Sequence, residues 1–321
     1  MKIISLFSGI GGSSEGYIAG GNDVLGAVEF LDYQAKVYRK NHPETKVYEE
    51  DIRTLDPLKI LKELGLEVGE LDVLDGSPPC SSFSVSGKGS KGWGETKDYG
   101  NKKQRTDDLF FEYIRFVDTI KPKAFVAENV KGLLIGKNRA YLSFILKSIK
   151  GYKIKVYLLN SKDFGVPQSR NRIFIIGIRD DITKEVNLDL KKKPLVTSGE
   201  ALKDLIPTKA ELEEADISKY SIYPKLKELG LGESVFNLVK VNPYKVAPTI
   251  TATIGGKGSN AVHHWDNRRL TVRELKRIAG FRDDFDFSVV DENRAREGIG
   301  RAVTPPVTKA IAEALKEVLY A

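Results

Sequence analysis

Short apolar runs alternate with amphipathic segments through the first 180 residues of this 321-residue chain, and that alternation constrains the fold most strongly. Each run has the length of one strand, and glycines or acidic residues follow most of them. Repeated strand–helix alternation favours an α/β fold with a doubly wound, mostly parallel sheet. The expected strands are 2–7, 23–28, 46–48, 71–75, 124–127, 153–159 and 172–178, and the expected helices are 31–41, 107–120, 271–281 and 305–319.

The pattern weakens over residues 181–247, which carry scattered prolines and similar numbers of acidic and basic side chains. We interpret this stretch as a second, smaller domain, and the chain is long enough for both. Helical spacing returns at Thr271, which stands at capping-box spacing from Glu274. The predicted organisation is a first domain over 1–190, a small domain over 191–270, and a return segment over 271–321 that completes the first domain.

Composition limits which binding partners and which cellular compartment are expected. The formal net charge of +7 permits a polyanionic partner without requiring one. No apolar run approaches a membrane span, and no secretory signal pattern precedes the first strand. A single unpaired thiol favours a reducing cytoplasm, and the three histidines show no metal-ligand spacing with it, so no metal is expected.

That thiol, Cys80, lies in a stiff turn directly after an apolar run. Gly76 and the pair Pro78-Pro79 end the run abruptly and fix the backbone before the cysteine. An inert buried thiol and a reactive nucleophile are the two alternatives. Because open α/β sheets bind their ligands at the carboxyl ends of strands, we favour the nucleophile.

A glycine-rich turn follows the first expected strand, with the sequence Phe7-Ser8-Gly9-Ile10-Gly11-Gly12. Such a turn lets a nucleotide approach the backbone at the start of a helix. Glu29, at the end of the second strand, is placed to accept hydrogen bonds from ribose hydroxyls. Asp51, after the third strand, is placed to accept one from an adenine amino group. The alternative is that both are solvated strand-end acids.

Three further features carry polar chemistry. Glu128 ends a wholly apolar strand, where partial desolvation suits a carboxyl group to proton donation; a helix cap or surface acid is the alternative. Arg170 and Arg172 are two apart in an extended segment, so they point to one side and could clamp a phosphate or a base edge, unless they form surface salt bridges. Residues 84–105 are rich in Gly, Ser and Lys and predict a mobile loop.

Taken together and in this order, these motifs resemble those of the DNA (cytosine-5)-methyltransferases over nearly the whole chain. The resemblance is carried by the turn at 7–12, Gly76-Ser77-Pro78-Pro79-Cys80, Glu128-Asn129-Val130, Gln168-Ser169-Arg170-Asn171-Arg172, Arg269 to Glu274, and Gly300 to Val307. It implies a Rossmann-like methyltransferase fold with a small target-recognition domain, and S-adenosylmethionine as cofactor. It also implies a monomer acting on double-stranded DNA in the cytoplasm of a prokaryotic or viral host cell.

The resemblance assigns roles to individual residues. Cys80 would be the nucleophile, Glu128 would hydrogen-bond the Watson–Crick edge of cytosine, and Arg172 would hold its 2-oxo group. Arg170 would also belong to the catalytic group. The cofactor would be bound by Phe7, Ser8, Gly9, Gly11, Gly12, Glu29, Phe30, Asp51, Ile52, Pro78, Leu109, Ala302 and Val303. DNA would be contacted by Ser81, Ser84, Lys88, Lys102, Lys103, Arg105, Gln168, Thr249 and Ile250.

The chain departs from the family pattern at three places: Ser81 replaces a usual Gln, Thr106-Asp107-Asp108 precedes Leu109 in place of Arg-Gly-x, and Arg301 replaces a usual Asn. Two other functions are alternatives. An RNA (tRNA) cytosine-5 methyltransferase built on two cysteines would need a second thiol, and the tRNA-acting branch usually carries Cys-Phe-Thr, which is absent here. A non-catalytic DNA-binding homologue would typically lack the Pro-Cys or Glu-Asn-Val motif.

Overall fold

The computed structural model describes residues 1–79, 108–136, 138–182, 185–236, 238–252 and 260–320, and the backbone alone of 97–99 and 102–104. The chain divides into two compact units. Unit 1 consists of Met1–Leu159, Asn171–Leu190 and Lys309–Ala321, and unit 2 consists of Asn160–Arg170 and Lys191–Thr308.

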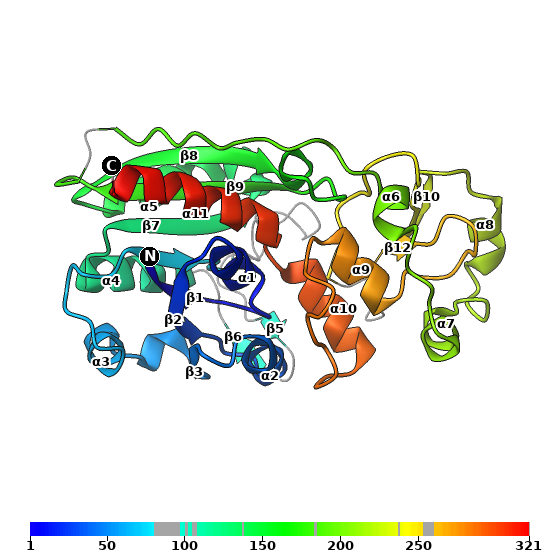
Figure 1. The fold of residues 1–321 in the computed structure, drawn as a ribbon, viewed down its shortest axis with the longest axis horizontal. Helices are drawn as coiled ribbons and strands as arrows, with labels where there is room; N and C mark the ends of the chain where they lie inside the picture. The colour runs from blue at the N-terminus through cyan, green and yellow to red at the C-terminus, as the bar shows by residue number, and fades with distance from the viewer. Residues whose placement is uncertain are drawn as a thin grey trace. The chain divides into compact units, whose positions relative to one another are not determined.

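Unit 1 is built on a seven-stranded sheet with the order β3-β2-β1-β4-β7-β9-β8 (Figure 1). Neighbours are parallel from β3 to β7, whereas β9 is antiparallel to β7. The chain starts at β1, moves outward to β3, and returns to β4 on the other side of β1, as a doubly wound sheet requires. This confirms the predicted α/β fold. The bounds are β1 (Lys2–Leu6), β2 (Asp23–Val28), β3 (Lys46–Tyr48), β4 (Val73–Gly76), β7 (Ala124–Val130), β8 (Tyr152–Asn160) and β9 (Asn171–Arg179).

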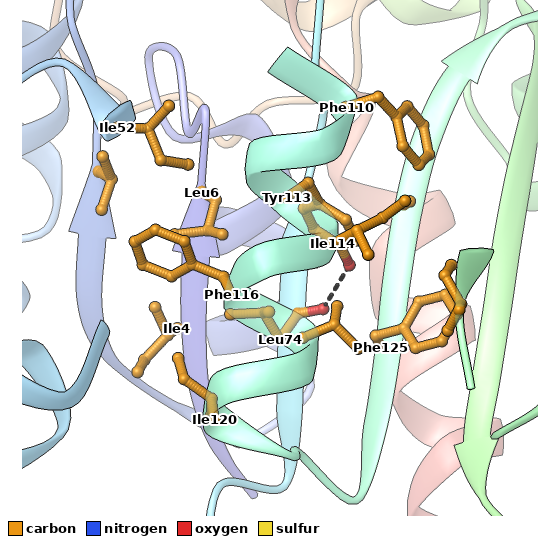
Figure 2. Packing of buried hydrophobic residues seen from close by; sticks show 14 of the residues in the cluster. Ile4, Leu6, Ile52, Leu74, Phe110, Tyr113, Ile114, Phe116, Ile120 and Phe125 are labelled. Atoms are coloured by element: carbon orange, nitrogen blue, oxygen red, sulfur yellow. Dashed lines mark hydrogen bonds between the residues drawn. The ribbon is translucent and has the colours of Figure 1, made fainter. Parts of the chain in front are cut away.

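The core of unit 1 forms where the sheet meets helix α4 (Leu109–Ile120). Ile4 and Leu6 of β1 point to this face because alternate residues of a strand share a side, and they join one buried cluster with residues of α4. Figure 2 shows Tyr113 and Phe116 of α4 over this face, with the Tyr113 hydroxyl donating to the Leu74 carbonyl at 3.0 Å. The intervening residues Ile3 and Ser5 therefore point to the opposite face.

The helices predicted over 31–41 and 305–319 are observed over Asp32–Asn41 and Pro305–Leu319, whereas the helices over Pro57–Glu63 and Asn138–Ser148 were not predicted. Helix α4 starts two residues later than the predicted 107, a residue outside the described part of the chain. A two-stranded antiparallel ladder, β5 (Lys97–Tyr99) with β6 (Lys102–Gln104), lies within the predicted loop segment 84–105. The other elements are α1 (Gly12–Ala19), α2 (Asp32–Asn41), η1 (Ile52–Thr54), α3 (Pro57–Glu63), η3 (Lys131–Leu134), α5 (Asn138–Ser148) and α11 (Pro305–Leu319), the last of which continues from unit 2.

Unit 2 combines short helices with a small sheet of order β10-β11-β12. Its helix starts are strongly specified, since Thr197, Thr208 and Thr271 each form a capping box with the glutamate three residues on. The elements are η4 (Ser161–Phe164), α6 (Ser198–Leu202), α7 (Lys209–Ala215), α8 (Tyr223–Glu228), β10 (Ser234–Val235), β11 (Leu238–Lys240), β12 (Ala261–Val262), α9 (Val272–Ile278) and α10 (Glu292–Arg301).

The observed division differs from the predicted boundaries, because residues 271–308 group with unit 2. Buried contacts explain this: Arg268 pairs with Glu274 of α9 at 2.8 Å, and Arg296 of α10 donates to the Leu270 carbonyl. The helix predicted over 271–281 also ends earlier, at Ile278, because Gly280 adopts a left-handed φ of 80°. In the part of the chain that the structure describes, no helix is long and apolar enough to cross a membrane.

Candidate active site

The turn between β1 and α1 holds three residues in the left-handed region: Phe7 at φ 53°, Gly9 at 58° and Gly11 at 95°. A non-glycine residue there is strained, and strain of this kind concentrates at functional sites. Gly11 cannot be replaced without rearrangement, because a Cβ atom would lie 2.5 Å from Nε2 of His42. The glycines therefore maintain an unusual backbone at the carboxyl end of β1, in front of the N-terminus of α1.

Glu29, the residue after β2, fixes this turn from the neighbouring strand. Its carboxylate accepts hydrogen bonds from the backbone N–H groups of Gly9 and Leu31, each at 2.8 Å, and its side chain is buried. Ser8 also ties the turn to β2, donating to the Val28 carbonyl at 3.0 Å. Each carboxylate oxygen can accept more than one hydrogen bond, so this structural role is compatible with the predicted contact to ribose hydroxyls.

The other predicted cofactor residues of unit 1 lie along the same edge of the sheet. Because β3, β2, β1 and β4 are adjacent and parallel, their carboxyl ends bring Asp51, Glu29, the glycine turn and Pro78 next to one another. Asp51 caps η1 by accepting from the Arg53 N–H at 3.0 Å. Gly12 starts α1 and Leu109 starts α4. Ile52, Pro78 and Leu109 are buried, and Phe30 is half-buried.

Asp75 of β4 is a buried carboxylate that the sequence did not single out. It accepts hydrogen bonds from the hydroxyls of Ser13 at 2.7 Å, Tyr17 at 3.0 Å and Ser5 at 3.1 Å. These donors come from α1 and β1, so one carboxylate joins the strand before Cys80 to the helix behind the glycine turn. Burial raises the pKa of Asp75 to about 6, although the three hydrogen bonds oppose this rise.

This shift predicts a pH-dependent effect on stability in an Asp75→Asn variant. Between about pH 4 and pH 6 the folded protein retains a proton on Asp75 that the unfolded chain releases, so folding binds protons. The free energy of unfolding of the wild type, relative to the variant, should therefore fall across this window, by on the order of 2–3 kcal/mol, and stay level above it. Urea denaturation of both proteins from pH 4 to pH 8 measures the difference.

Tyr17→Phe serves as the matched variant for this measurement. It removes a hydrogen bond that lowers the pKa of Asp75, so the upper end of the window should move to higher pH. A difference in unfolding free energy between wild type and Asp75→Asn that is constant from pH 4 to pH 8 would contradict the assignment of a titrating, buried Asp75.

The chain before Cys80 is held from β7, the strand that ends in the Glu-Asn-Val motif. Strands β4 and β7 are in register at Gly76 and Ala127. Asn129 then donates from Nδ2 to the Pro78 carbonyl at 3.1 Å, and its side chain is buried. The residue two positions before the candidate nucleophile is thus anchored beside Glu128.

Glu128 forms an ion pair with Arg172 across the antiparallel pair β7–β9. Arg172 Nε lies 3.0 Å from Glu128 Oε1, and the two side chains are 19% and 13% exposed. Arg172 also donates from Nη1 to the Asn171 carbonyl at 2.8 Å. A planar guanidinium beside a largely buried carboxylate fixes the orientation of both groups and leaves them at the carboxyl end of β7.

Arg170 and Gln168 have different surroundings from Arg172. In unit 2, Gln168 Oε1 accepts from the Ile250 N–H and Arg170 Nη1 donates to the Ile250 carbonyl, both at 3.1 Å. Arg170 also donates to the Arg301 carbonyl at 3.3 Å. The side chains of Gln168 and Arg170 are both buried. Thr249 donates to the Ser169 carbonyl at 2.7 Å. Each arginine of the expected clamp therefore has its own protein partners, Arg172 within unit 1 and Arg170 within unit 2.

Several predicted residues can be placed only in part. Cys80, Ser81, Ser84, Lys88 and Arg105 lie outside the described residues, and Lys102 and Lys103 are described only as backbone of β6. In unit 2, Ala302 ends α10 and is half-buried, while Val303 is buried. The side chain of Arg301 pairs with Glu297 of the same helix. Among the described residues no group of His, Cys, Asp and Glu is arranged to hold a metal ion.

Sequence reasoning missed Asp75, the anchoring role of Asn129, and Arg53, which pairs with Asp51. Asn129 had a signal, since it stands inside the Glu-Asn-Val motif. Asp75 also had a weak one, because an acid inside a strand that is otherwise apolar is unusual without a partner. Nothing in the sequence pairs Arg53 with a particular acid.

Comparisons with known proteins identify the family of this chain. A family model described as C-5 cytosine-specific DNA methylase matches residues 1–317. The chain is 31% identical over 386 aligned residues to the type II methyltransferase M.DdeI of Desulfomicrobium norvegicum, covering 98% of this chain and 88% of the relative. It is 32% identical over 347 residues to M.NgoPII of Neisseria gonorrhoeae, covering 99% and 96%.

Solved structures share the fold. A candidate DNA modification methyltransferase encoded within a prophage (E. coli) matches with a TM-score of 0.81 at 23% identity and covers all of both chains. The Dnmt2 methyltransferase of S. pombe matches with a TM-score of 0.70 at 17% identity, covering 100% of this chain and 99% of its own. At such identities the likeness shows the fold alone. The family model and the relatives show more: the chain belongs to the C-5 cytosine-specific DNA methylase family and is a DNA (cytosine-5)-methyltransferase.

Proposed function

We propose that this enzyme transfers the methyl group of S-adenosylmethionine to C5 of a cytosine in double-stranded DNA, acting as a monomer with Cys80 as nucleophile. One structural observation carries the proposal beyond family membership. Asn129 holds the Pro78 carbonyl at 3.1 Å, which ties the segment that leads to Cys80 to the strand that bears Glu128. This contact supports the proposal, because the proposed nucleophile and proton donor would then follow neighbouring strand ends.

The carboxyl edge of unit 1 has the chemistry that S-adenosylmethionine requires. The left-handed turn at Phe7, Gly9 and Gly11 would let the cofactor approach the protein backbone closely. Glu29 would accept hydrogen bonds from the ribose hydroxyls of the cofactor. Asp51 would accept from the adenine amino group, beside buried Ile52 and Leu109. When bound, the cofactor supplies an electrophilic methyl group on a sulfonium centre. The assignment of Ala302 and Val303 to this cofactor rests on the family resemblance.

The C5 atom of cytosine is a poor nucleophile, and the proposed chemistry makes it a better one. The Cys80 thiolate forms a bond to C6, and the electrons of the C5–C6 double bond then make C5 an enamine carbon that can accept the methyl group. Glu128 donates a hydrogen bond or proton at N3, and Arg172 holds the 2-oxo group. With the methyl group on C5 and S-adenosylhomocysteine as the leaving group, water takes up the C5 proton. The C5–C6 double bond re-forms as the C6–sulfur bond breaks, the thiolate is regenerated, and N3 returns any proton it received to Glu128.

Access to the base requires that it leave the duplex, since C5 and C6 cannot be reached inside the base stack. The basic segment 84–105 and the loop at Thr249–Ile250 would hold the DNA in that state. In unit 2, Gln168 and Arg170 support this by fixing the Ile250 backbone. The relatives are named type II methyltransferases, which supports a role as the modification enzyme of a restriction–modification system in a prokaryotic or virus-infected cell.

Bisulfite sequencing of DNA from a methylation-deficient bacterial host that expresses the protein tests this proposal. We expect protected cytosines within one short recurring sequence and complete conversion in the same host with an empty vector. Bisulfite sequencing of the tRNA from the same cells separates the RNA alternative. Fully converted DNA with protected tRNA cytosines would overturn the proposed DNA substrate.

A further inference from the structure

A single arginine joins Asp51 to the start of helix α4. The guanidinium of Arg53 contacts Asp51 with Nη1, at 3.2 Å from Oδ1 and 3.1 Å from Oδ2. On its other side it contacts Asp108 with Nε and Nη2, at 2.9 Å and 2.8 Å. The second contact is a two-point fork, which fixes the plane of the guanidinium as well as its position.

A second arginine holds the same segment from the opposite direction. Arg115 of α4 donates to the backbone carbonyls of Ile52 at 2.8 Å and Leu55 at 3.1 Å. Ile52 and Leu109 belong to one buried cluster, so apolar packing adds to these contacts. The segment that carries Asp51 is therefore held against α4 by Arg53, by Arg115 and by the buried side chain of Ile52.

These contacts determine how the Asp51 carboxylate is turned. Its side chain is 27% exposed, so without partners it would sample several rotamers in contact with water. Oδ1 instead accepts from the Arg53 N–H at 3.0 Å, and Arg53 Nη1 lies beside both oxygens. Fixing a side chain before its ligand arrives removes an entropic cost of binding.

From this geometry we infer that Arg53 sets the enzyme's preference for a purine with a 6-amino group, by holding the Asp51 carboxylate in one orientation, with Asp108 as its support. The inference deepens the proposed function and rests on it, because it places the adenine of the cofactor at Asp51. Arg53 is a positioning residue: it acts on the amino group through the Asp51 carboxylate.

A pair of ligands that differ at one purine position tests this inference. S-adenosylhomocysteine carries the 6-amino donor, whereas S-inosylhomocysteine carries a 6-oxo acceptor, which cannot donate a hydrogen bond to the Asp51 carboxylate oxygens. Isothermal titration calorimetry with the purified full-length protein should give a wild-type preference for the adenosyl ligand of about tenfold or more, the usual scale for a hydrogen bond to a charged group. Arg53→Met should reduce that preference to about threefold or less.

Two further variants sharpen the comparison. Asp108→Asn leaves the Arg53–Asp51 contact but weakens its support, so its preference should lie between those of wild type and Arg53→Met. Arg39→Met is the matched control: it breaks a comparable ion pair, with Glu49 at 2.7 Å, and should keep the wild-type preference. Circular dichroism and thermal melts verify that each variant is folded, and Asp108→Asn still tests the inference if Arg53→Met does not fold.

The outcomes separate the inference from the function on which it rests. If Arg53→Met bound both ligands more weakly by the same factor, the preference would be unchanged. That result would overturn the inference and would indicate that Arg53 has only a structural role. That result would leave the proposed function intact, because the wild type would still bind the cofactor analogue. A wild type that bound neither ligand would overturn the proposed cofactor and this inference with it.

Discussion

Glu128→Gln is expected to lower the rate constant of methyl transfer by about 10²- to 10⁴-fold, the usual contribution of a general acid. The affinity for S-adenosylhomocysteine should change by less than about twofold, since the predicted cofactor residues belong to other strand ends. Glutamine keeps the shape of glutamate but cannot deliver a proton to N3, and it loses the charge that pairs with Arg172 at 3.0 Å. Single-turnover transfer to duplex DNA and calorimetry with the analogue measure the two quantities.

The matched control for this substitution is Glu49→Gln. Glu49 also pairs with an arginine, Arg39, at 2.7 Å, but it lies after β3 and has no role in the proposed chemistry. It should transfer methyl groups at the wild-type rate. Equal losses of rate and of analogue affinity in Glu128→Gln would indicate a structural role for Glu128, and an unchanged rate would remove it from the mechanism.

The strands and the mostly parallel sheet were the part of the fold that sequence could predict. Apolar runs gave seven strands, and each acid or turn after a run was expected at a strand's carboxyl end. In a parallel sheet those ends share an edge, which agrees with the single cofactor site that the family resemblance implied for Glu29, Asp51 and Pro78. Their detailed bonding was not predictable. The sequence predicts that Glu29 binds ribose hydroxyls. In the structure its carboxylate also accepts hydrogen bonds from two backbone N–H groups that the sequence does not identify.

Contacts between distant residues explain most of what the sequence could not give. The donors to Asp75 are 58 to 70 positions away, and only the folded sheet brings β1, α1 and β4 together. Arg53 lies 55 positions from Asp108, so its bridging role is equally invisible in the sequence. Local rules such as capping boxes succeeded at Thr271 because both partners are within one helical turn.

The arginine pair shows how far a local rule depends on where a strand begins. Residues two apart do share a side in an extended strand, but β9 begins at Asn171, so only Arg172 is within it. Arg170 precedes the strand and belongs to unit 2, where buried backbone carbonyls are its partners. The boundary predicted at residue 270 also depends on distant contacts: α9 and α10 are tied to the segment before them by buried arginines, and residues 271–308 group with unit 2.

The central claim is that Cys80 adds covalently to C6 of cytosine in DNA, and a mechanism-based trap tests it most directly. In the proposed sequence the hydrogen at C5 leaves as a proton before the C6–sulfur bond breaks, whereas fluorine at C5 cannot leave as a cation. Duplex DNA with 5-fluorocytosine at the methylated position, located first by bisulfite sequencing, should therefore remain bonded to the enzyme after methyl transfer. The adduct should survive denaturation and should require S-adenosylmethionine.

The measurement is the mobility of the protein–DNA adduct on a denaturing gel, with mass spectrometry of the linked peptide. The account predicts one adduct at Cys80 in the wild type and none in Cys80→Ala, although the variant should still bind the same duplex. Free protein and free DNA after incubation of the wild type with the cofactor and this duplex would contradict covalent catalysis by Cys80.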